Sequence, residues 1–451
     1  MLRPPVTATL ADFVVDARFE DLPPAVRREA ARTLVNWVGG CVGGASHEAL
    51  GTIWRAVGPF AGGAEATVLG SARRTDPITA ALLNGASGAV LDFDDTHLRT
   101  VIHPASPIAP AVLALSQHMP VTGASFLHAL VLGIEVACKI GNGISPDHYR
   151  HGWHITGTCG VIGAAAACSK LLGLDAQGTR WALSAAATQA AGLREMFGGM
   201  ARILHAGRAA QNGLSAALFA REGLVSSDAG IEAEAGFAKV LSRRHDWDEM
   251  TDGLGERWET LENTYKPFAT GIVAHPAIDG CIRLRRAHGL TADEIARIEV
   301  AVNPIALMLT DNPDPTTALE ARLSIQHVCA TGIVHGAAGV AELTDATIGR
   351  PETVALRARV AASPDDGLER DQARVRIETG DGRVFETFVE HAYGSLENPM
   401  TDEDLDDKVR TLAEPVLGAD RTERLITLCR GVAELRAAAA IAEAGEADGA
   451  A

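Results

Sequence analysis

Acidic and imidazole side chains crowd into one short stretch of this sequence, Leu91-Asp-Phe-Asp-Asp-Thr-His97, with His103 close behind it. Clustered carboxylates repel one another and lose hydration when buried, so folding alone gives no reason to collect them. If the stretch is helical, Asp92, Asp95 and Thr96 stand at positions i, i+3 and i+4 and share one face. The stretch therefore predicts a functional site.

Two kinds of chemistry suit this cluster. Aspartates beside His97 and His103 can fix imidazole tautomers and support acid–base catalysis. The same residue types could also bind zinc or manganese. A helix C-terminus with solvated acids would explain the cluster without any site.

A polar loop, His151-Gly-Trp-His-Ile-Thr-Gly-Thr158, leads into an apolar helical segment. Thr156 or Thr158 is a candidate N-cap for that helix, and a helix N-terminus favours anions. His154, just before it, is a candidate acid–base group. It could equally cap the helix or pack in the core.

Basic residues recur every three positions in Arg202-Ile-Leu-His-Ala-Gly-Arg208. On a helix, Arg202, His205 and Arg208 would form one cationic stripe. An arginine stays charged and can bind a carboxylate through two hydrogen bonds. The stripe therefore predicts either a carboxylate clamp or a solvated basic face.

Two later segments each carry one further candidate. Lys266 lies in the tight turn Tyr265-Lys-Pro-Phe-Ala-Thr-Gly271. An apolar turn would lower the pKa of the lysine and make it a base; otherwise its ammonium group reaches solvent. Ser324 and His327 share a face of a predicted helix, where His327 either contacts a substrate or lines the core.

Length and composition indicate a large helical protein. The chain has 451 residues, which favours two domains over one core. Aromatic residues make up only 4%, and the apolar content comes mainly from Ala, Leu, Val, Ile and Gly, which suits closely packed helices. The net charge of −17 argues against nucleic-acid and anionic-membrane partners. An anionic substrate then requires a local basic pocket.

Cysteines and the chain start indicate a cytoplasmic protein. The seven cysteines are scattered and form no C-x-x-C pair, which is typical of buried free thiols in a reducing compartment. Residues 1–5 lack the apolar segment of a signal peptide. The apolar segment 155–174 contains Lys170 and many small residues, so we expect a core helix rather than a membrane span.

Periodicity predicts a mainly α protein with an α+β second domain. It places helices at 24–42, 107–118, 125–144, 156–172, 176–191 and 205–222, and another from the N-cap Asp76 to the acidic cluster. Strands at 297–302, 373–379 and 383–389, the last two joined by Gly380-Asp-Gly382, alternate with helices at 274–288 and 319–332. We therefore predict a large helical domain formed by residues 1–267 and completed by 399–451. An α+β lid domain at 268–398 is inserted into it.

These segments, in this order, resemble the MmgE/PrpD family, which includes 2-methylcitrate dehydratase, cis-aconitate decarboxylase and iminodisuccinate epimerase. The resemblance extends to Glu397-Asn-Pro-Met-Thr401. It implies a helical domain with an α+β lid and an active site in the cleft between them. It also implies no organic cofactor, no metal, and a homodimer. The sequence contains no nucleotide-binding, serine-hydrolase or H-E-x-x-H motif that would indicate another class of enzyme.

The resemblance assigns site residues by motif. Asp92, Thr96 and His103 match the first active-site cluster, His154 matches the His of the G-x-H-x-T loop, and Lys266 matches the Lys before Pro. Two positions depart from the dehydratases and decarboxylases. Arg202 stands where those enzymes have Lys in a K-P-L-H motif, and His327 stands where the lid helix usually carries Tyr. An arginine can clamp a carboxylate but does not readily donate a proton.

The implied chemistry is proton abstraction α to a carboxylate of a small di- or tricarboxylate. The substrate-binding residues would be Arg202, His205 and His327. Lys266 and His154 are the candidate bases, and His103 is the candidate acid.

Three reactions remain open. Family membership favours a carbon–oxygen lyase of the 2-methylcitrate dehydratase kind, and the missing lysine favours an epimerase. A cis-aconitate-type decarboxylase is the third. A helical interaction protein that has kept a pocket and a metal-dependent hydrolase are the alternatives outside the family chemistry.

Overall fold

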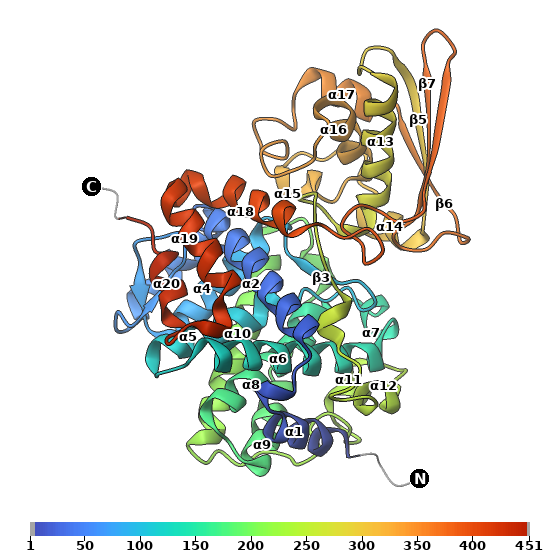
Figure 1. The fold of residues 1–451 in the computed structure, drawn as a ribbon. Coiled ribbons are helices and arrows are strands. Elements are labelled where there is room, and N and C mark those ends of the chain that lie inside the picture. The colour runs from blue at the N-terminus through green and yellow to red at the C-terminus, as the bar shows by residue number, and fades with distance from the viewer. Residues whose placement is uncertain (1–4, 449–451) are drawn as a thin grey trace.

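Helices from both ends of the chain form the larger part of the molecule (Figure 1). The computed structural model describes residues 5–448, so residues 1–4, where the absence of a signal peptide was expected, lie outside the described residues. The helices of this part are α1 (Val6–Asp16), α2 (Pro24–Gly44), α3 (Glu48–Val57), α4 (Pro77–Val90), α5 (Ala105–His118), α6 (Gly123–Ile144), α7 (Asp147–Arg150), α8 (Ile155–Leu172), α9 (Ala176–Ala187), α10 (Ile203–Arg221), α11 (Phe237–Leu241), α12 (Trp247–Thr251), α18 (Asp402–Leu417), α19 (Ala419–Arg430) and α20 (Ala439–Ala444).

The helices predicted in this part are confirmed, with ends shifted by a few residues. The Asp76 side chain accepts a hydrogen bond from the backbone N–H of Thr79, as its N-cap role requires. Helix α18, from the C-terminal part of the chain, packs against α2 from the N-terminal part, so segments far apart in the sequence lie side by side (Figure 1). All seven cysteines are buried free thiols.

Small residues let the central helices approach closely. Helix α10 packs against α4 and α8. A Cβ atom on Gly207 of α10 would lie 2.5 Å from the carbonyl oxygen of Leu82 in α4. This contact fixes the start of α10 beside the end of α4, where the candidate site lies. Helices α6 and α8 are apolar enough to span a membrane, but 89% and 83% of their apolar windows are buried, so they form the helical core.

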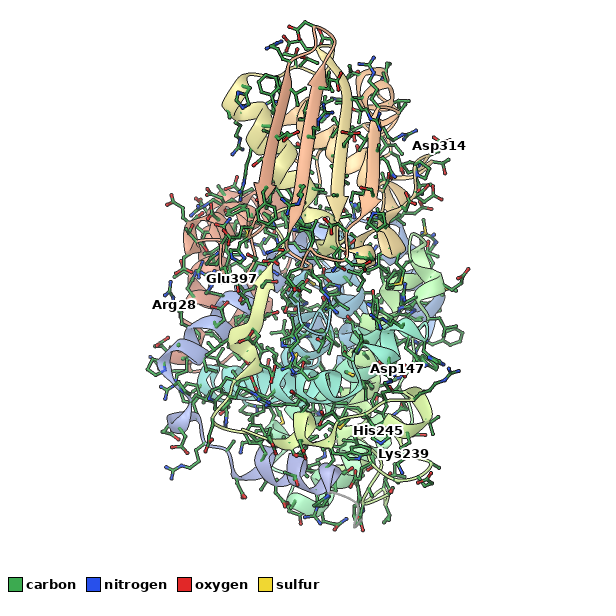
Figure 2. The ribbon with its side chains drawn as sticks, turned by 90° about the vertical axis from the view of Figure 1, so that its right-hand side faces the viewer. Arg28, Asp147, Lys239, His245, Asp314 and Glu397 are labelled. Atoms are coloured by element: carbon green, nitrogen blue, oxygen red, sulfur yellow. The ribbon has the colours of Figure 1, made fainter. Side chains whose placement is uncertain are left out.

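An α+β unit covers one end of the helical part (Figure 1). Its sheet has the order β6-β5-β7-β8, from β5 (Ile295–Val302), β6 (Val360–Pro364), β7 (Ala373–Thr379) and β8 (Val384–Val389). Only β5 and β6 pair in parallel. Helix α13 (His275–His288) packs on one face of the sheet, and the other face is open (Figure 2). The remaining helices are α14 (Pro304–Thr310), α15 (Ala318–Ala321), α16 (Ile325–His335) and α17 (Pro351–Arg357).

The predicted β7–β8 hairpin and the strand at 297–302 are confirmed. The helix predicted at 319–332 is interrupted, because Ser324 leaves the helix and its side chain caps α16 by accepting a hydrogen bond from the N–H of His327. Strand β6 was missed. Its residues Val-Ala-Ala-Ser-Pro have little β-propensity, and its pairing with β5 is long-range.

The prediction of a helical face formed by Asp92, Asp95 and Thr96 was wrong. Helix α4 ends at Val90, and Asp92 adopts a left-handed conformation with φ of 53°. Residues Asp95–His97 form strand β3, which pairs antiparallel with β4 (Asn263–Tyr265). Acids at a helix C-terminus oppose the helix dipole, and the distant strand supplies the backbone partners that a helix would have provided.

Candidate active site

The pairing of β3 with β4 brings Lys266 against the acidic stretch. Asp95 lies opposite Tyr265 in the ladder, and Lys266 follows immediately. The Nζ of Lys266 donates hydrogen bonds to Asp92 Oδ1 at 2.7 Å and to Asp94 Oδ1 at 2.8 Å. Only 1% of Lys266 is exposed. The three residues therefore form a buried ion-paired cluster.

The prediction of a lowered pKa for Lys266 was wrong. Burial acts to lower the pKa of this lysine, but the charges of Asp92 and Asp94 outweigh burial, and the pKa is raised. Lys266 is therefore a charged ammonium group and not a free base. The sequence showed an apolar turn but gave no means to see that two carboxylates would meet the lysine there.

Arg202 supplies a second cation to the same carboxylate. Its Nη2 lies 3.3 Å from Asp92 Oδ1 and donates a hydrogen bond of 2.8 Å to the carbonyl of Ala89 in the last turn of α4. Burial acts to raise the pKa of Asp92, but Arg202 and Lys266 outweigh it and hold the pKa well below its usual range. The predicted cationic stripe does not point to a single site. Arg202 reaches this cluster, whereas Arg208 is exposed and makes no contact with it.

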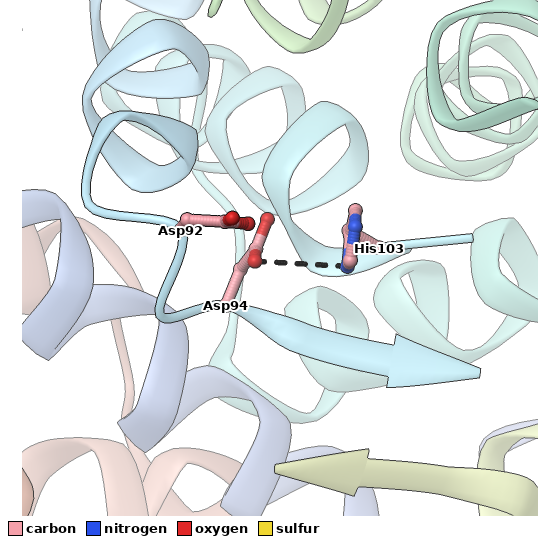
Figure 3. A group of neighbouring side chains, drawn as sticks. All are labelled: Asp92, Asp94 and His103. Atoms are coloured by element: carbon pink, nitrogen blue, oxygen red, sulfur yellow. Dashed lines mark ion pairs between the residues drawn. The ribbon is translucent and has the colours of Figure 1, made fainter. Parts of the chain in front are cut away.

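His103 lies beside Asp94, as Figure 3 shows. Its Nδ1 is 3.6 Å from Asp94 Oδ1 and 2.7 Å from the carbonyl oxygen of Asp95. A carbonyl oxygen only accepts, so we assign the ring proton to Nδ1, which leaves a lone pair on Nε2. Thr96, fully buried, places its Oγ1 3.1 Å from the same Nδ1. Burial lowers the pKa of His103 despite Asp94, so the ring is neutral.

His154 lies at the N-cap of α8 and pairs with His205. The two Nδ1 atoms are 2.8 Å apart. Burial, the neighbouring His205 and the charge of Arg202 lower the pKa of His154, so this ring is also neutral. The predicted capping threonines do not cap the helix. Thr156 accepts a hydrogen bond from the backbone N–H of His103, and Thr158 bonds to the ring of His148.

A small cavity joins these groups between the helical part and the α+β unit. It measures about 50 Å³. Its walls are Asp92, Val101, His103, Tyr149, His154, Phe197, Arg202, Lys266, Gly271, Ile272, Val273, Leu309 and Leu323. A larger hollow of about 560 Å³ lies on the open face of the sheet, but its glutamates pair with Arg297 and Arg376, and its Arg374 lies over the Phe388 ring. The chemistry therefore belongs to the smaller cavity.

Backbone strain gathers at the same place. Among residues 5–448, the non-glycine residues with positive φ are Asp92 at 53° and Val101 at 58°, and both line the cavity. Such conformations cost on the order of 1–3 kcal/mol each and persist where the surrounding structure enforces them. The strain indicates that the fold is built to hold this loop in place.

Two predicted substrate-binding residues do not line the cavity. His205 contacts it only through His154 and lies against a separate hollow. His327 is fully buried in α16, where neither ring nitrogen has a hydrogen-bond partner within the described structure. Burial lowers the pKa of His327 to about 4, so it is a neutral core residue.

Three residues of the site were not predicted as such. Asp94 belongs to the ion-paired cluster, and Tyr149 forms part of the cavity wall. Lys408 of α18 is buried, and its Nζ donates hydrogen bonds to the carbonyls of Phe93 at 2.7 Å and Lys266 at 2.9 Å. It thereby ties together the two loops that carry the cluster. Nothing in the acidic, amphipathic sequence around Lys408 indicated this role.

Asp92, Asp94 and His103 offer ligand atoms close enough to hold a metal ion. However, the facing Oδ1 atoms of both aspartates already accept hydrogen bonds from the Lys266 ammonium group. A divalent cation there would meet a fixed positive charge. These side chains are therefore better suited to hold the Lys266 ammonium group than a metal ion.

The fold and the cavity define a two-part, mainly helical protein that brings paired acids, cations and neutral imidazoles together in one site. The chain belongs to the MmgE/PrpD family: residues 8–250 match its N-terminal domain and residues 268–432 its C-terminal domain.

Curated relatives resemble nearly the whole chain. The cis-aconitate decarboxylase-like protein oryM of Aspergillus oryzae is 28% identical over 93% of both chains. The cis-aconitate decarboxylase of Aspergillus terreus is 27% identical over 93% of this chain and 91% of its own length. The human cis-aconitate decarboxylase is 28% identical over 80% and 78%. The names of these relatives describe enzymes that act on a carboxylate substrate.

Proposed function

We propose that this protein is a hydro-lyase that removes a proton α to a carboxylate of a small di- or tricarboxylate and expels a hydroxyl group, as 2-methylcitrate dehydratases do. One observation carries the proposal. His103 is neutral, its Nδ1 is engaged by the Asp95 carbonyl, and its Nε2 lone pair remains available in a cavity that also holds two cations.

His103 is the proposed base, in place of the acid role expected from the sequence. When Nε2 takes up the substrate proton, the ring becomes an imidazolium. Asp94, 3.6 Å from Nδ1, stabilises that charge, and the Asp95 carbonyl and Thr96 hold the ring in orientation. Lys266 and Arg202 face the negative charge that develops on the substrate enolate. His154, the other imidazole of the cavity, is the proposed acid.

Unpaired arginines around the cavity support an anionic substrate. Asp92 and Asp94 balance the charges of Arg202 and Lys266, so a polycarboxylate needs further cations. Arg194 lies 4.5 Å over the Tyr149 ring, and Arg370 donates to the carbonyls of Leu98 and Arg99. Neither has a carboxylate within ion-pair distance among residues 5–448. The positive electrostatic potential of these arginines near the cavity is opposite in sign to the overall charge of −17.

Decarboxylation is the second candidate, because the curated relatives are named cis-aconitate decarboxylases. Decarboxylation replaces a carboxylate with a proton and therefore requires a proton donor. His154 could supply that proton in either reaction, so the donor does not separate the two candidates. Removal of an α-proton also needs a base, which the neutral His103 supplies and decarboxylation does not use. The hydro-lyase therefore ranks first.

Product analysis by NMR tests the proposal. The protein is incubated with 2-methylcitrate, citrate, cis-aconitate and an iminodicarboxylate. A new unsaturated product with no loss of carbon supports the hydro-lyase. Release of carbon dioxide supports the decarboxylase, and exchange of the α-proton without elimination supports the epimerase. No change in any compound would contradict an activity on small polycarboxylates.

The assembly and location are also proposals. The family resemblance supports a homodimer, which light scattering can test. Seven buried free thiols support a reducing compartment such as the cytoplasm.

A further inference from the structure

We infer that His154 and His205 form a proton wire between the active-site cavity and a second, solvent-facing hollow. His205 is then a positioning and relay residue rather than a substrate ligand. The inference deepens the proposed function and rests on it for turnover, but its first test needs no substrate.

The two histidines border two different spaces. His154 lines the cavity that contains His103 and Lys266, and only 4% of it is exposed. His205 lines an open, mostly apolar hollow of about 350 Å³ along α10, which the cavity does not reach. The Nδ1–Nδ1 distance of 2.8 Å is the link between the two spaces.

Two glycines hold the His205 ring in this place. A Cβ atom on Gly157 would lie 3.2 Å from the Cβ of His205, and one on Gly192 would lie 3.1 Å from its Cγ. Gly192 also has a φ of 133°, which side-chain-bearing residues rarely adopt. The backbone therefore closes on both sides of the ring and keeps its Nδ1 on His154.

The hydrogen bond dictates opposite tautomers. Burial and the charge of Arg202 lower the pKa of His205 to about 4, and burial holds the pKa of His154 well below its usual value, so both rings are neutral at pH 7. A hydrogen bond between two Nδ1 atoms of neutral rings needs one N–H donor and one bare acceptor. One ring therefore carries its proton on Nδ1 and the other on Nε2.

This arrangement can move a proton and leave both imidazole rings neutral. In the delivery direction, His154 Nε2–H passes its proton to the leaving hydroxyl group while His205 Nδ1–H passes its proton to His154 Nδ1. Water in the hollow then protonates His205 Nε2 and leaves as hydroxide into the solvent. Three bonds to hydrogen break and three form, and one proton crosses from solvent to the cavity. In the reverse sequence His154 Nε2 takes up the proton that His103 removed from the substrate, and His205 Nε2 returns a proton to the solvent, so both rings regain their first tautomers.

The neighbouring charges favour transfer of a proton through the two rings over retention of a proton on either ring. Arg202 lies close enough to lower the pKa of both rings, so an imidazolium on either is disfavoured. On the other side, Asp92 and His103 face His154, and Arg208 borders the hollow beside His205. For a hydro-lyase, the wire supplies the proton that the departing hydroxide requires inside the cavity.

The first test is ¹⁵N NMR of the wild-type protein with labelled histidine. We expect one of these two rings as the Nδ1–H tautomer and the other as the Nε2–H tautomer, joined by a coupling across the N–H···N bond. His205→Gln should remove the coupling and assign the pair. Identical tautomers, a missing coupling, or an imidazolium at pH 7 would overturn the inference whatever the substrate is.

The second test uses turnover. His205→Gln should lower kcat by about 100-fold with little change in KM, and the solvent isotope effect should change from a multi-proton to a single-proton dependence in mixtures of H₂O and D₂O. Added imidazole should restore activity to His205→Ala in proportion to its concentration. Asn212→Ala, in the same hollow but without contact to His154, is the matched control and should behave as wild type.

Unchanged kcat and an unchanged isotope dependence in His205→Gln would overturn the wire. If the wild-type protein processes no polycarboxylate, the proposed function fails, and the NMR result still decides whether the wire exists.

Discussion

Lys266→Met should destabilise the protein strongly as well as inactivate it. Met has a similar length but no charge, so it leaves two carboxylates that the lysine bonds at 2.7 and 2.8 Å without their shared cation. Breaking a buried ion pair costs about 3–5 kcal/mol. A chain of 451 residues has an unfolding entropy of about 0.9 kcal/mol per kelvin. The midpoint of thermal unfolding should therefore fall by about 3–5 °C.

A second substitution makes this prediction sharper. After Lys266 is removed, Asp92 still has Arg202 at 3.3 Å, whereas Asp94 keeps only the neutral His103 at 3.6 Å. Asp94→Asn in the Lys266→Met background should therefore recover most of the lost stability. Asp94 can also lose its unpaired charge by binding a proton at low pH, so the loss of stability in Lys266→Met should grow as pH rises.

Differential scanning calorimetry at pH 6 and pH 8 measures these changes. The matched control is Lys239→Met, because Lys239 pairs with Glu234 at 2.6 Å on the surface and should cost less than about 1 kcal/mol. An unchanged midpoint in Lys266→Met, or no recovery on adding Asp94→Asn, would refute the buried ion-pair reasoning.

Four further predictions follow from the same geometry. Activity should survive exhaustive chelation, because the Lys266 ammonium group already binds the Oδ1 atoms of Asp92 and Asp94. Loss of activity that one divalent ion restores would contradict this. Burial raises the pKa of Asp95 to about 7, above the unfolded value of about 3.9, so wild-type stability falls as pH rises from about 4 to about 7 and then levels off. The midpoint of Asp95→Asn should therefore exceed the wild-type midpoint by an amount that grows from about pH 5 to about pH 7 and is constant above it. Arg202→Lys should raise KM more than it lowers kcat, because lysine keeps the positive charge but cannot bind a carboxylate through two parallel hydrogen bonds. A higher kcat at unchanged KM would show that Arg202 does not have this carboxylate-binding role. Arg150 is exposed and close enough to Arg370 for its charge to lower the pKa of that residue. Arg150→Gln should therefore lower kcat/KM by about two- to fivefold at low salt and leave it unchanged at high salt, unlike the remote control Arg424→Gln.

Local sequence predicted most helices because their signals are local. Asp76 caps α4, and the α8 sequence is mostly apolar and small. The β7–β8 hairpin was equally visible, since Gly380 to Gly382 lies between two alternating segments. The stretch 91–97 was predicted wrongly because its conformation depends on β4, which is remote in sequence. Strand β6 was missed for the same reason.

The site could be predicted by residue type but not by charge state. Asp92, His103, His154, Arg202 and Lys266 all line the cavity, as their motifs suggested. Their protonation could not be predicted, because it depends on distances between segments. The sequence could not show that Lys266 would meet two carboxylates, and the link between His154 and His205 likewise depends on how α8 packs against α10.

The central claim is that His103 abstracts a proton α to a carboxylate of a small polycarboxylate. The most direct measurement is the rate at which the substrate α-proton signal disappears in D₂O, compared between wild type and His103→Gln. The wild-type protein should exchange or eliminate at that carbon for at least one compound, and the folded variant should be about 10²- to 10⁴-fold slower. An equal rate in the folded His103→Gln variant would contradict the claim.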